Sequence, residues 1–204
     1  MLLADPQVDY SCYNNSGKTA LYWAIKHEYI DIVEKLLANP RVDPEYYDIA
    51  GQTQLHYAIP NNSIALVEKL LANPRVDPNC HDIFGQTPLH LAIMYNSVNL
   101  VEELLSNPRV DLNGHDTLGQ TPLHYVLIYN SVSLVEKLLA NLQVDPNSSE
   151  FSQRTPLHCA VIEGSQQAGD LRPYSPTIHL SSFELDFERA IKILISEPRV
   201  DPIV

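Results

Sequence analysis

The segment DIFGQTPLHLAIMYNSVNLVEELLSNPRVD, residues 82–111, contains the signals that decide the fold of this chain. Thr87-Pro88 predicts a helix start. A threonine hydroxyl at the N-cap accepts from an orphan backbone N–H, and proline at N1 gives up a donor that had no partner. We expect this helix to end at about Asn96, because asparagine tolerates the left-handed backbone that closes a helix. Ser97 is then expected to cap a second helix.

The second helix is expected to carry one apolar stripe. Its apolar residues follow one another at helical spacings, which places them on a single side: Leu100, Val101, Leu104 and Leu105. Asn107-Pro108 ends this helix, and the Pro- and Asp-rich segment after it is expected to be a connector. Residues 82–111 therefore predict a pair of short helices with one buried face.

The same unit recurs along the chain. Five threonines follow one another at a step of 34 residues: Thr19, Thr53, Thr87, Thr121 and Thr155. Because a pair of short helices cannot bury its apolar stripe alone, the units must stack. The sequence predicts a single all-α domain over 1–204, a solenoid of about five helix-turn-helix repeats. The tail of an incomplete repeat at 1–13 precedes repeats at 14–47, 48–81, 82–115 and 116–149 and a last repeat at 150–204.

Residues 85–92 and 119–124 resemble the G-x-T-P-L-H signature of the ankyrin repeat, and the likeness continues in register over nearly the whole chain. The resemblance implies L-shaped units with two antiparallel helices and hairpin-like loops on a concave side. It also implies that variable residues on that side contact a partner protein.

The chain departs from the ankyrin signature in a few places. The step is 34 residues where about 33 is usual. Gln54 replaces the signature proline in the second repeat, and Pro60 should shorten the first helix of that repeat because it removes one helical hydrogen bond.

The two ends of the array are also atypical. Leu2-Leu3 and Val8-Asp9 match the tail of a repeat, so either a degenerate turn caps the N-terminus or the chain comes from a longer array. In the last repeat the pattern returns 22 residues late, which indicates an insertion at about 165–186. Its Ser, Pro and Gln content predicts a loop. This loop is either a tolerated surface excursion or a flap that contacts a partner.

Composition narrows the classes of partner and compartment. The net charge is −12, with 25 acidic against 13 basic residues, which disfavours nucleic acid and anionic membranes as partners. The three cysteines form no C-x-x-C pair, and neither a signal peptide nor a membrane span is evident. We expect a monomer in the cytoplasm, with the nucleus and a host-cell cytosol as alternatives.

The sequence offers no catalytic, metal-binding or cofactor-binding residue, so we expect a non-enzymatic protein without a cofactor. His56, His90, His124 and His158 recur once per repeat, but helices about 8–10 Å apart cannot bring them to one metal with ligand distances of about 2 Å. These imidazoles are interpreted as buried groups bonded to threonine or loop atoms, and Cys159 as a core residue. The arginines Arg41, Arg75, Arg109 and Arg199 lie beside aspartates and suggest local charge balancing.

The predicted partner-binding residues lie at loop tips and at the ends of the first helices, which the family geometry places on the concave side. They are Ile83, Phe84, Gln86, Met94, Tyr95, Leu118, Gln120, Ile128, Tyr129, Phe151, Arg154 and Ile162. Apolar residues with central tyrosines and polar edges are typical of a protein interface. The alternative is that the loop-tip residues pack against the adjacent repeat.

The predicted function is a scaffold that binds another protein, whose identity the sequence does not give. The alternatives are a passive spacer or a fragment of a larger multidomain ankyrin protein, and a catalytic role for the inserted loop.

Overall fold

The computed structural model describes residues 12–14, 17–129, 131–169 and 180–201, together with the side chains of these residues except those of 163–169 and 180–187. These residues form helices and, apart from an isolated bridge between Tyr13 and Thr19, no β-structure. The predicted all-α repeat fold is therefore confirmed. The chain divides into an N-terminal unit, Met1–Asp111, and a C-terminal unit, Leu112–Val204.

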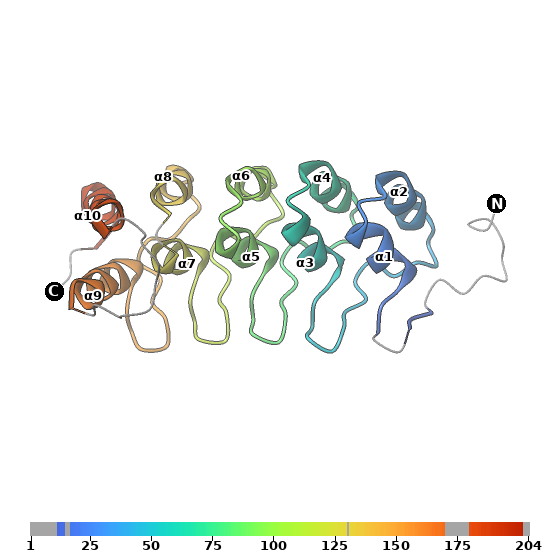
Figure 1. Cartoon of the computed structure of the whole chain (residues 1–204), viewed down its shortest axis with the longest axis horizontal. Helices are drawn as coiled ribbons and strands as arrows, with labels where there is room; N and C mark the ends of the chain where they lie inside the picture. The colour runs from blue at the N-terminus through green and yellow to red at the C-terminus, as the bar shows by residue number, and fades with distance from the viewer. Residues whose placement is uncertain (1–11, 15–16, 130, 170–179, 202–204) are drawn as a thin grey trace. The chain divides into compact units, whose positions relative to one another are not determined.

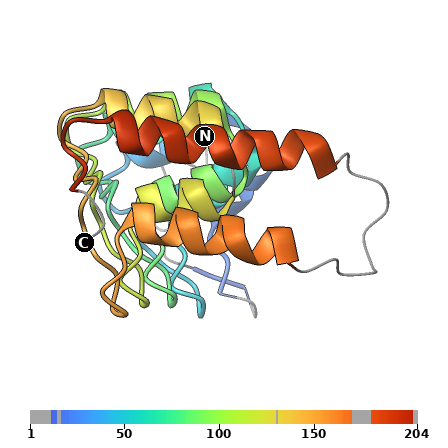
Figure 2. The same cartoon turned by 90° about the vertical axis from the view of Figure 1, so that its left-hand side faces the viewer.

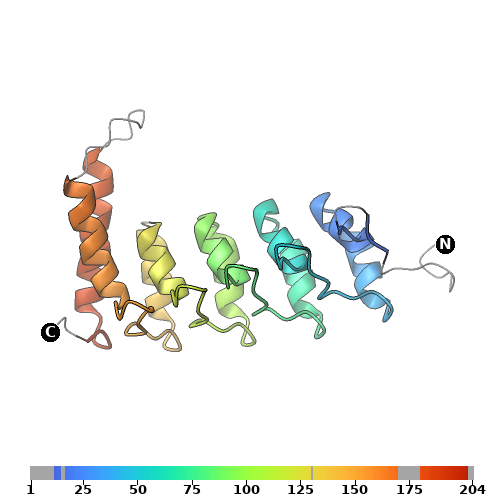
Figure 3. The same cartoon turned by 90° about the horizontal axis from the view of Figure 1, so that it is seen from below.

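The N-terminal unit contains three helix pairs. The first helices of the pairs lie in one row and the second helices in another (Figure 1). The first row consists of α1 (Ala20–Lys26), α3 (Gln54–Ala58) and α5 (Pro88–Met94), and the second of α2 (Ile30–Ala38), α4 (Ile64–Ala72) and α6 (Val98–Ser106). A hairpin-like loop descends before each helix of the first row, and Figure 3 shows the pairs following one another in chain order.

The C-terminal unit contains two helix pairs, α7 (Pro122–Ile128) with α8 (Val132–Ala140) and α9 (Pro156–Gly169) with α10 (Leu180–Ser196). The loop predicted at about 165–186 is wrong at both ends, because residues 165–169 continue α9 and residues 180–186 belong to α10. The two long helices pack side by side and extend past α7 and α8 (Figure 2). Extending an existing helix adds one hydrogen bond per residue, which here outweighs a composition typical of loops. Residues 170–179 lie outside the described part.

The first helices begin as the sequence predicts. Thr87 is the N-cap of α5, its hydroxyl accepts from the backbone N–H of His90 at 3.5 Å, and Pro88 occupies the first helical position. Nδ1 of His90 accepts in return from the backbone N–H of Thr87 at 3.1 Å, so threonine and histidine together form a capping box. The same reciprocal pair opens α3 and α7.

The turns between paired helices agree only in part with the prediction. Asn62 and Asn96 adopt the left-handed conformation, with φ of 53° and 50°. Ser97 occupies the N-cap position of α6, as predicted, and Ser63 that of α4, but neither side chain makes a capping hydrogen bond. Val67 and Val101 instead donate their backbone N–H groups to the carbonyls of these serines. The turn after α5 is closed by backbone bonds from Asn96 to the Ile93 carbonyl and from Ser97 to the Ala92 carbonyl.

Pro60 shortens the first helix of the second repeat, as predicted. Helix α3 ends at Ala58 and continues as the 3₁₀ turn η2 (Ile59–Asn61). The missing proline N–H removes an α-helical bond, and the 3₁₀ turn is tighter.

Connector arginines of the second, third and last repeats join each of these repeats to the one before it. The Arg109 guanidinium donates to the carbonyl oxygens of Leu71 at 3.1 Å and Asn73 at 3.3 Å, and also to that of Val76. These carbonyls lie at the end of α4 and in the connector after it, where backbone acceptors lack helical partners and the helix dipole favours a cation. Equivalent bonds run from Arg75 to Leu37, Asn39 and Val42, and from Arg199 to Leu139, Leu142 and Val144. These arginines therefore cap the preceding repeat, and the predicted balancing of adjacent aspartates is not their principal role.

A second link between repeats comes from connector asparagines. The side-chain amide of Asn79 donates to the carbonyl of Arg109 at 2.8 Å and accepts from the backbone N–H of Asp111 at 2.7 Å. Asn113 forms the same pair of bonds in the C-terminal unit, to the backbones of Gln143 and Asp145. Each side-chain amide therefore bonds to the backbone of the next connector as a neighbouring β-strand would, by donating one hydrogen bond and accepting another.

Substituting Arg109 should destabilise the protein. Arg109→Met keeps the aliphatic stem but leaves three carbonyls of the preceding repeat without their donor, which we expect to lower the free energy of unfolding by about 1–2 kcal/mol. Chemical denaturation measures the change. Lys35→Met, which removes an exposed cation of α2, is the control and should leave the denaturation midpoint unchanged. Equal stability of the two variants would contradict a capping role for Arg109.

Gln54→Pro should stabilise the protein. The buried Oε1 of Gln54 has no hydrogen-bond partner among the described residues, and the equivalent positions in repeats three and four are buried prolines at N1. The preceding Thr53 is extended, as a residue before proline must be. We expect a gain of about 0.5–1 kcal/mol, measured as a higher Tm in calorimetry. A lower Tm would show that the bond from Nε2 of Gln54 to the Tyr46 carbonyl matters more.

Candidate functional site

The hairpins before the first helices present their tips on a fixed backbone. In the third repeat Oδ1 of Asp82 accepts from the backbone N–H groups of Phe84 at 2.9 Å and Gln86 at 3.0 Å. Gly85 provides the positive φ of 73° that the turn requires. Asp82 is 7% exposed, and its carboxylate is engaged in hydrogen bonds within the hairpin. The residues between it and Gly85 point outward.

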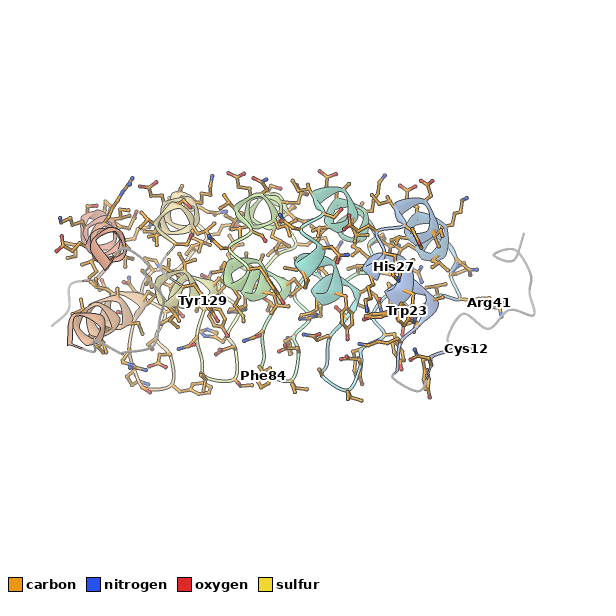
Figure 4. The ribbon with its side chains drawn as sticks, in the orientation of Figure 1. Cys12, Trp23, His27, Arg41, Phe84 and Tyr129 are labelled. Carbon is orange, nitrogen blue, oxygen red and sulfur yellow. The ribbon has the colours of Figure 1, made fainter. Side chains whose placement is uncertain are left out.

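The tip residues of the N-terminal unit are strongly exposed. Ile49 is 96% exposed and Phe84 is 59% exposed, and Ile83 is also exposed. Ile83 donates its backbone N–H to the carbonyl of Ala50 at 3.0 Å, which ties one hairpin to the next. More than half of the surface of Ile49, Ile83 and Phe84 is therefore open to solvent. Figure 4 shows Phe84 at the end of its hairpin.

Three further predicted residues of the N-terminal unit lie near this hairpin. Tyr95 is the C-cap of α5 and is 56% exposed, whereas Met94 and Gln86 are half-buried. The exposed ring of Tyr95 follows a helix whose other residues are almost all buried. Of the five residues predicted in this unit, Ile83, Phe84 and Tyr95 are the most exposed to solvent.

In the C-terminal unit the predicted residues divide in the same way. Phe151 is 75% exposed, and Leu118, Ile128 and Tyr129 are also exposed. Gln120, Arg154 and Ile162 are half-buried. Arg154 forms an ion pair with Glu150 four residues earlier, and this internal partner makes it a weaker candidate for binding.

Tyr129 lies against a structural tyrosine. Its ring centroid is 6.0 Å from that of Tyr125, whose hydroxyl donates to Oδ2 of the buried Asp116 at 2.9 Å. Tyr125 is buried and ties α7 to the hairpin before it. Tyr129, just after α7, is exposed (Figure 4).

An aromatic cluster in the first repeat was missed by the sequence analysis. The rings of Trp23, His27 and Tyr29 follow one another, with centroids 5.9 and 5.7 Å apart and interplanar angles of 14° and 25°. All three are exposed, Trp23 by 42%. Trp23 and His27 lie next to each other on and just after α1 (Figure 4). A sequence signal existed, because Trp23 is the sole tryptophan of the chain and His27 occupies the repeat position of Tyr95 and Tyr129.

Beside this cluster lies a compact charged network. Nζ of Lys18 donates to Oδ2 of Asp48 at 2.8 Å and to the hydroxyl of Tyr57, which itself donates to Asp48. Lys18 also lies 4.4 and 4.1 Å from the ring centroids of Tyr22 and Tyr57. This network ties the first hairpin to the second repeat.

The network keeps its charges across the usual pH range. Burial alone would raise the pKa of Asp48, but the hydrogen bonds from Lys18 and Tyr57 outweigh it and lower that pKa to about 2. Burial, together with the bond to Asp48, raises the pKa of Tyr57 to about 12. None of the three groups is poised for proton transfer near neutral pH.

The recurring histidines have structural roles, as predicted. Nδ1 of His56 accepts from the backbone N–H of Thr53 at 3.2 Å, and its Nε2 lies 3.0 Å from the carbonyl of Gln86. An amide can only donate and a carbonyl can only accept, so the neutral tautomer with hydrogen on Nε2 is assigned. Burial lowers the pKa of His56, which favours this neutral form. His124 is placed in the same way between Thr121 and the carbonyl of Arg154.

Cys12, Cys80 and Cys159 form no disulfide with one another. Cys12 is exposed, Cys80 half-buried and Cys159 buried, which confirms the predicted core position of Cys159. Sγ of Cys80 lies 3.0 Å from the Thr53 hydroxyl, and burial raises its pKa to about 12, so it is a weak nucleophile.

Within the ranges given above, no three His, Cys, Asp or Glu residues are grouped so as to hold a metal ion. Among the helices described, none combines the length and the apolar character needed to cross a bilayer.

Comparison with known protein families agrees with the geometry. Residues 55–150 and 108–171 match the family described as ankyrin repeats (3 copies), and residues 16–49 match the single ankyrin repeat. No curated protein matches the chain. Since the family matches span well over half of the sequence and coincide with the helix pairs, the chain belongs to the ankyrin repeat family.

Proposed function

We propose that this chain is a non-enzymatic scaffold that binds another protein through its hairpin tips and the ends of its first helices. The observation that carries the proposal is the exposure of Phe84 and Tyr95 in the N-terminal unit, and of Phe151 and Tyr129 in the C-terminal unit. Ankyrin repeats are in general modules of protein–protein interaction, and the family membership supports the same conclusion.

The energetics favour these positions as anchors. Large aromatic side chains bury much apolar area on binding and are enriched among residues that dominate interface energies. Their backbones are held by the Asp82 turn and by the capping box of Thr87 and His90, so little conformational entropy is lost when a partner docks. A rigid frame with exposed rings is suited to recognition.

The histidine and cysteine chemistry described above supports a binding role over a catalytic one. Both nitrogens of His56 are engaged in structural bonds, and the Cys80 thiol stays protonated at neutral pH. The absence of a disulfide among Cys12, Cys80 and Cys159 is consistent with a reducing compartment, and we propose a cytoplasmic, monomeric protein.

Substituting one exposed tyrosine in each unit tests this function. The full chain and its Tyr95→Ala, Tyr129→Ala double variant are compared in affinity capture from the native cell, followed by quantitative mass spectrometry. We expect at least one captured protein to lose affinity by about 30-fold, since two exposed anchors are removed. Circular dichroism should show the helical content unchanged, because both rings lie outside the core.

Glu102→Ala, which changes an exposed residue of α6 on the other row, is the matched control and should keep every partner. If the tyrosine variant also keeps every partner at unchanged affinity, the proposed surface is wrong and a passive spacer becomes the better description.

A further inference from the structure

Charge is distributed unevenly within the repeats. Three stretches that cover the hairpin tip, the first helix and the start of the second helix contain no Asp, Glu, Lys or Arg: residues 49–67, 83–101 and 117–135. The histidines in these stretches, His56, His90 and His124, are buried. The entire net charge of −12 therefore lies outside them.

The carboxylates at the base of the hairpins do not change this picture. Asp82 and Asp116 are each 7% exposed, and Asp48 is paired with Lys18. Each accepts hydrogen bonds from the backbone of its own hairpin. Their charges are compensated inside the fold and are not available to a ligand.

Exposed charges lie instead on the second row of helices. In the N-terminal unit Glu68 and Lys69 on α4 and Glu102 on α6 are exposed, and Lys69 pairs with Glu34 of α2 at 2.5 Å. The proposed binding residues Phe84 and Tyr95 belong to the uncharged stretches.

We infer that the partner contacts repeats two and three of the N-terminal unit with an uncharged polypeptide segment, made of apolar and hydrogen-bonding side chains. This inference rests on the proposed function, since it names the chemistry of the partner at that same surface. A partner lysine or carboxylate placed over Phe84 or Tyr95 would lose water without meeting an opposite charge, and a desolvated unpaired charge is strongly unfavourable. Attraction of a cation to an aromatic ring is smaller than this loss. A neutral segment avoids it and can hydrogen-bond to the exposed amide of Asn62 and the Tyr95 hydroxyl.

The first repeat is outside this inference. It carries Lys18, Lys26 and Glu28 around the Trp23 cluster, so it has charges of both signs where the next repeats have none. The contrast makes the lack of charge a specific property of the later stretches, those of repeats two and three in the N-terminal unit and that of repeat four in the C-terminal unit.

A selection experiment tests the inference. Short random peptides displayed on phage are selected against the immobilised full chain, and the winners are titrated against purified wild-type protein and variants. We expect peptides depleted in Asp, Glu, Lys and Arg, whose affinity changes less than about 3-fold between about 50 and 500 mM NaCl. Tyr95→Lys and Tyr95→Glu should each weaken binding by about 10-fold or more, because either sign leaves a buried charge unpaired.

Two controls sharpen the test. Tyr95→Phe should stay within about 3-fold of wild type, since it keeps the ring and removes only one hydrogen bond. Glu102→Lys should have no effect, because it changes charge on the other row of helices.

Opposite effects of the two charged variants would overturn the inference. Basic peptides that bind more tightly to Tyr95→Glu and are released by salt would show that the surface selects cations. Acidic peptides favoured by Tyr95→Lys would likewise contradict a neutral segment. If no selected peptide responds to Phe84→Ala or Tyr95→Ala, the proposed binding surface itself fails and the inference falls with it.

Discussion

The repeat depends on the two hydrogen bonds made by the imidazole of the Thr-x-x-His segment. With Nδ1 it accepts from the threonine that starts its own helix, and with Nε2 it donates to a carbonyl of the next hairpin, as His56 does with Thr53 and Gln86. One neutral ring thus fixes a helix start and the spacing between two repeats. A lysine could not do both, because the bond from the Thr53 N–H requires an acceptor and an ammonium group has none. Protonation of Nδ1 would remove the acceptor, so the fold requires the neutral imidazole. Burial favours this form because it lowers the pKa of His56.

Because inward groups hold the framework, outward positions are free for recognition. The arginines and asparagines of the connectors bond to backbone atoms of neighbouring repeats, as Arg109 does to Leu71 and Asn79 to Asp111. Bonds to backbone do not depend on which side chains the neighbours carry. A tip such as Phe84, or a helix end such as Tyr95, can therefore differ between repeats without loss of the stack. The atoms that stabilise the stack therefore differ from the atoms that are proposed to bind a partner, although both belong to the same short segment.

The sequence predicted the local features and missed the distant ones. Thr87-Pro88 marks a helix start because the N-cap and N1 rules act over a few residues, and Pro60 shortens α3 for the same reason. The bonds of Arg109 reach carbonyls 33 to 38 residues earlier, and a backbone acceptor leaves no trace in the sequence pattern. The nearby Asp111 was visible and suggested a different partner.

The candidate surface follows the same division. Exposure of Phe84 and Tyr95 follows from their repeat positions, so the sequence could predict it. The stack of Trp23, His27 and Tyr29 depends on the left-handed Glu28, φ 55°, which turns the chain between the helix end and Tyr29. A glutamate in that conformation is uncommon, and no sequence rule favours it over the asparagine found in later repeats.

The net charge of a protein acts over a longer distance than the charges inside a binding contact. In this chain the two differ, because the net charge is acidic and the stretch 83–101 is neutral. The field of −12 charges acts over about one Debye length in physiological salt and can bias which proteins approach. Once water is expelled from a contact, only the groups inside it count, and those of 83–101 are neutral. A cationic partner can thus be attracted by the second row of helices and still be held through an uncharged segment. In the proposed complex, the acidic composition influences how the partner approaches, and the tyrosines and hairpin tips form the contact.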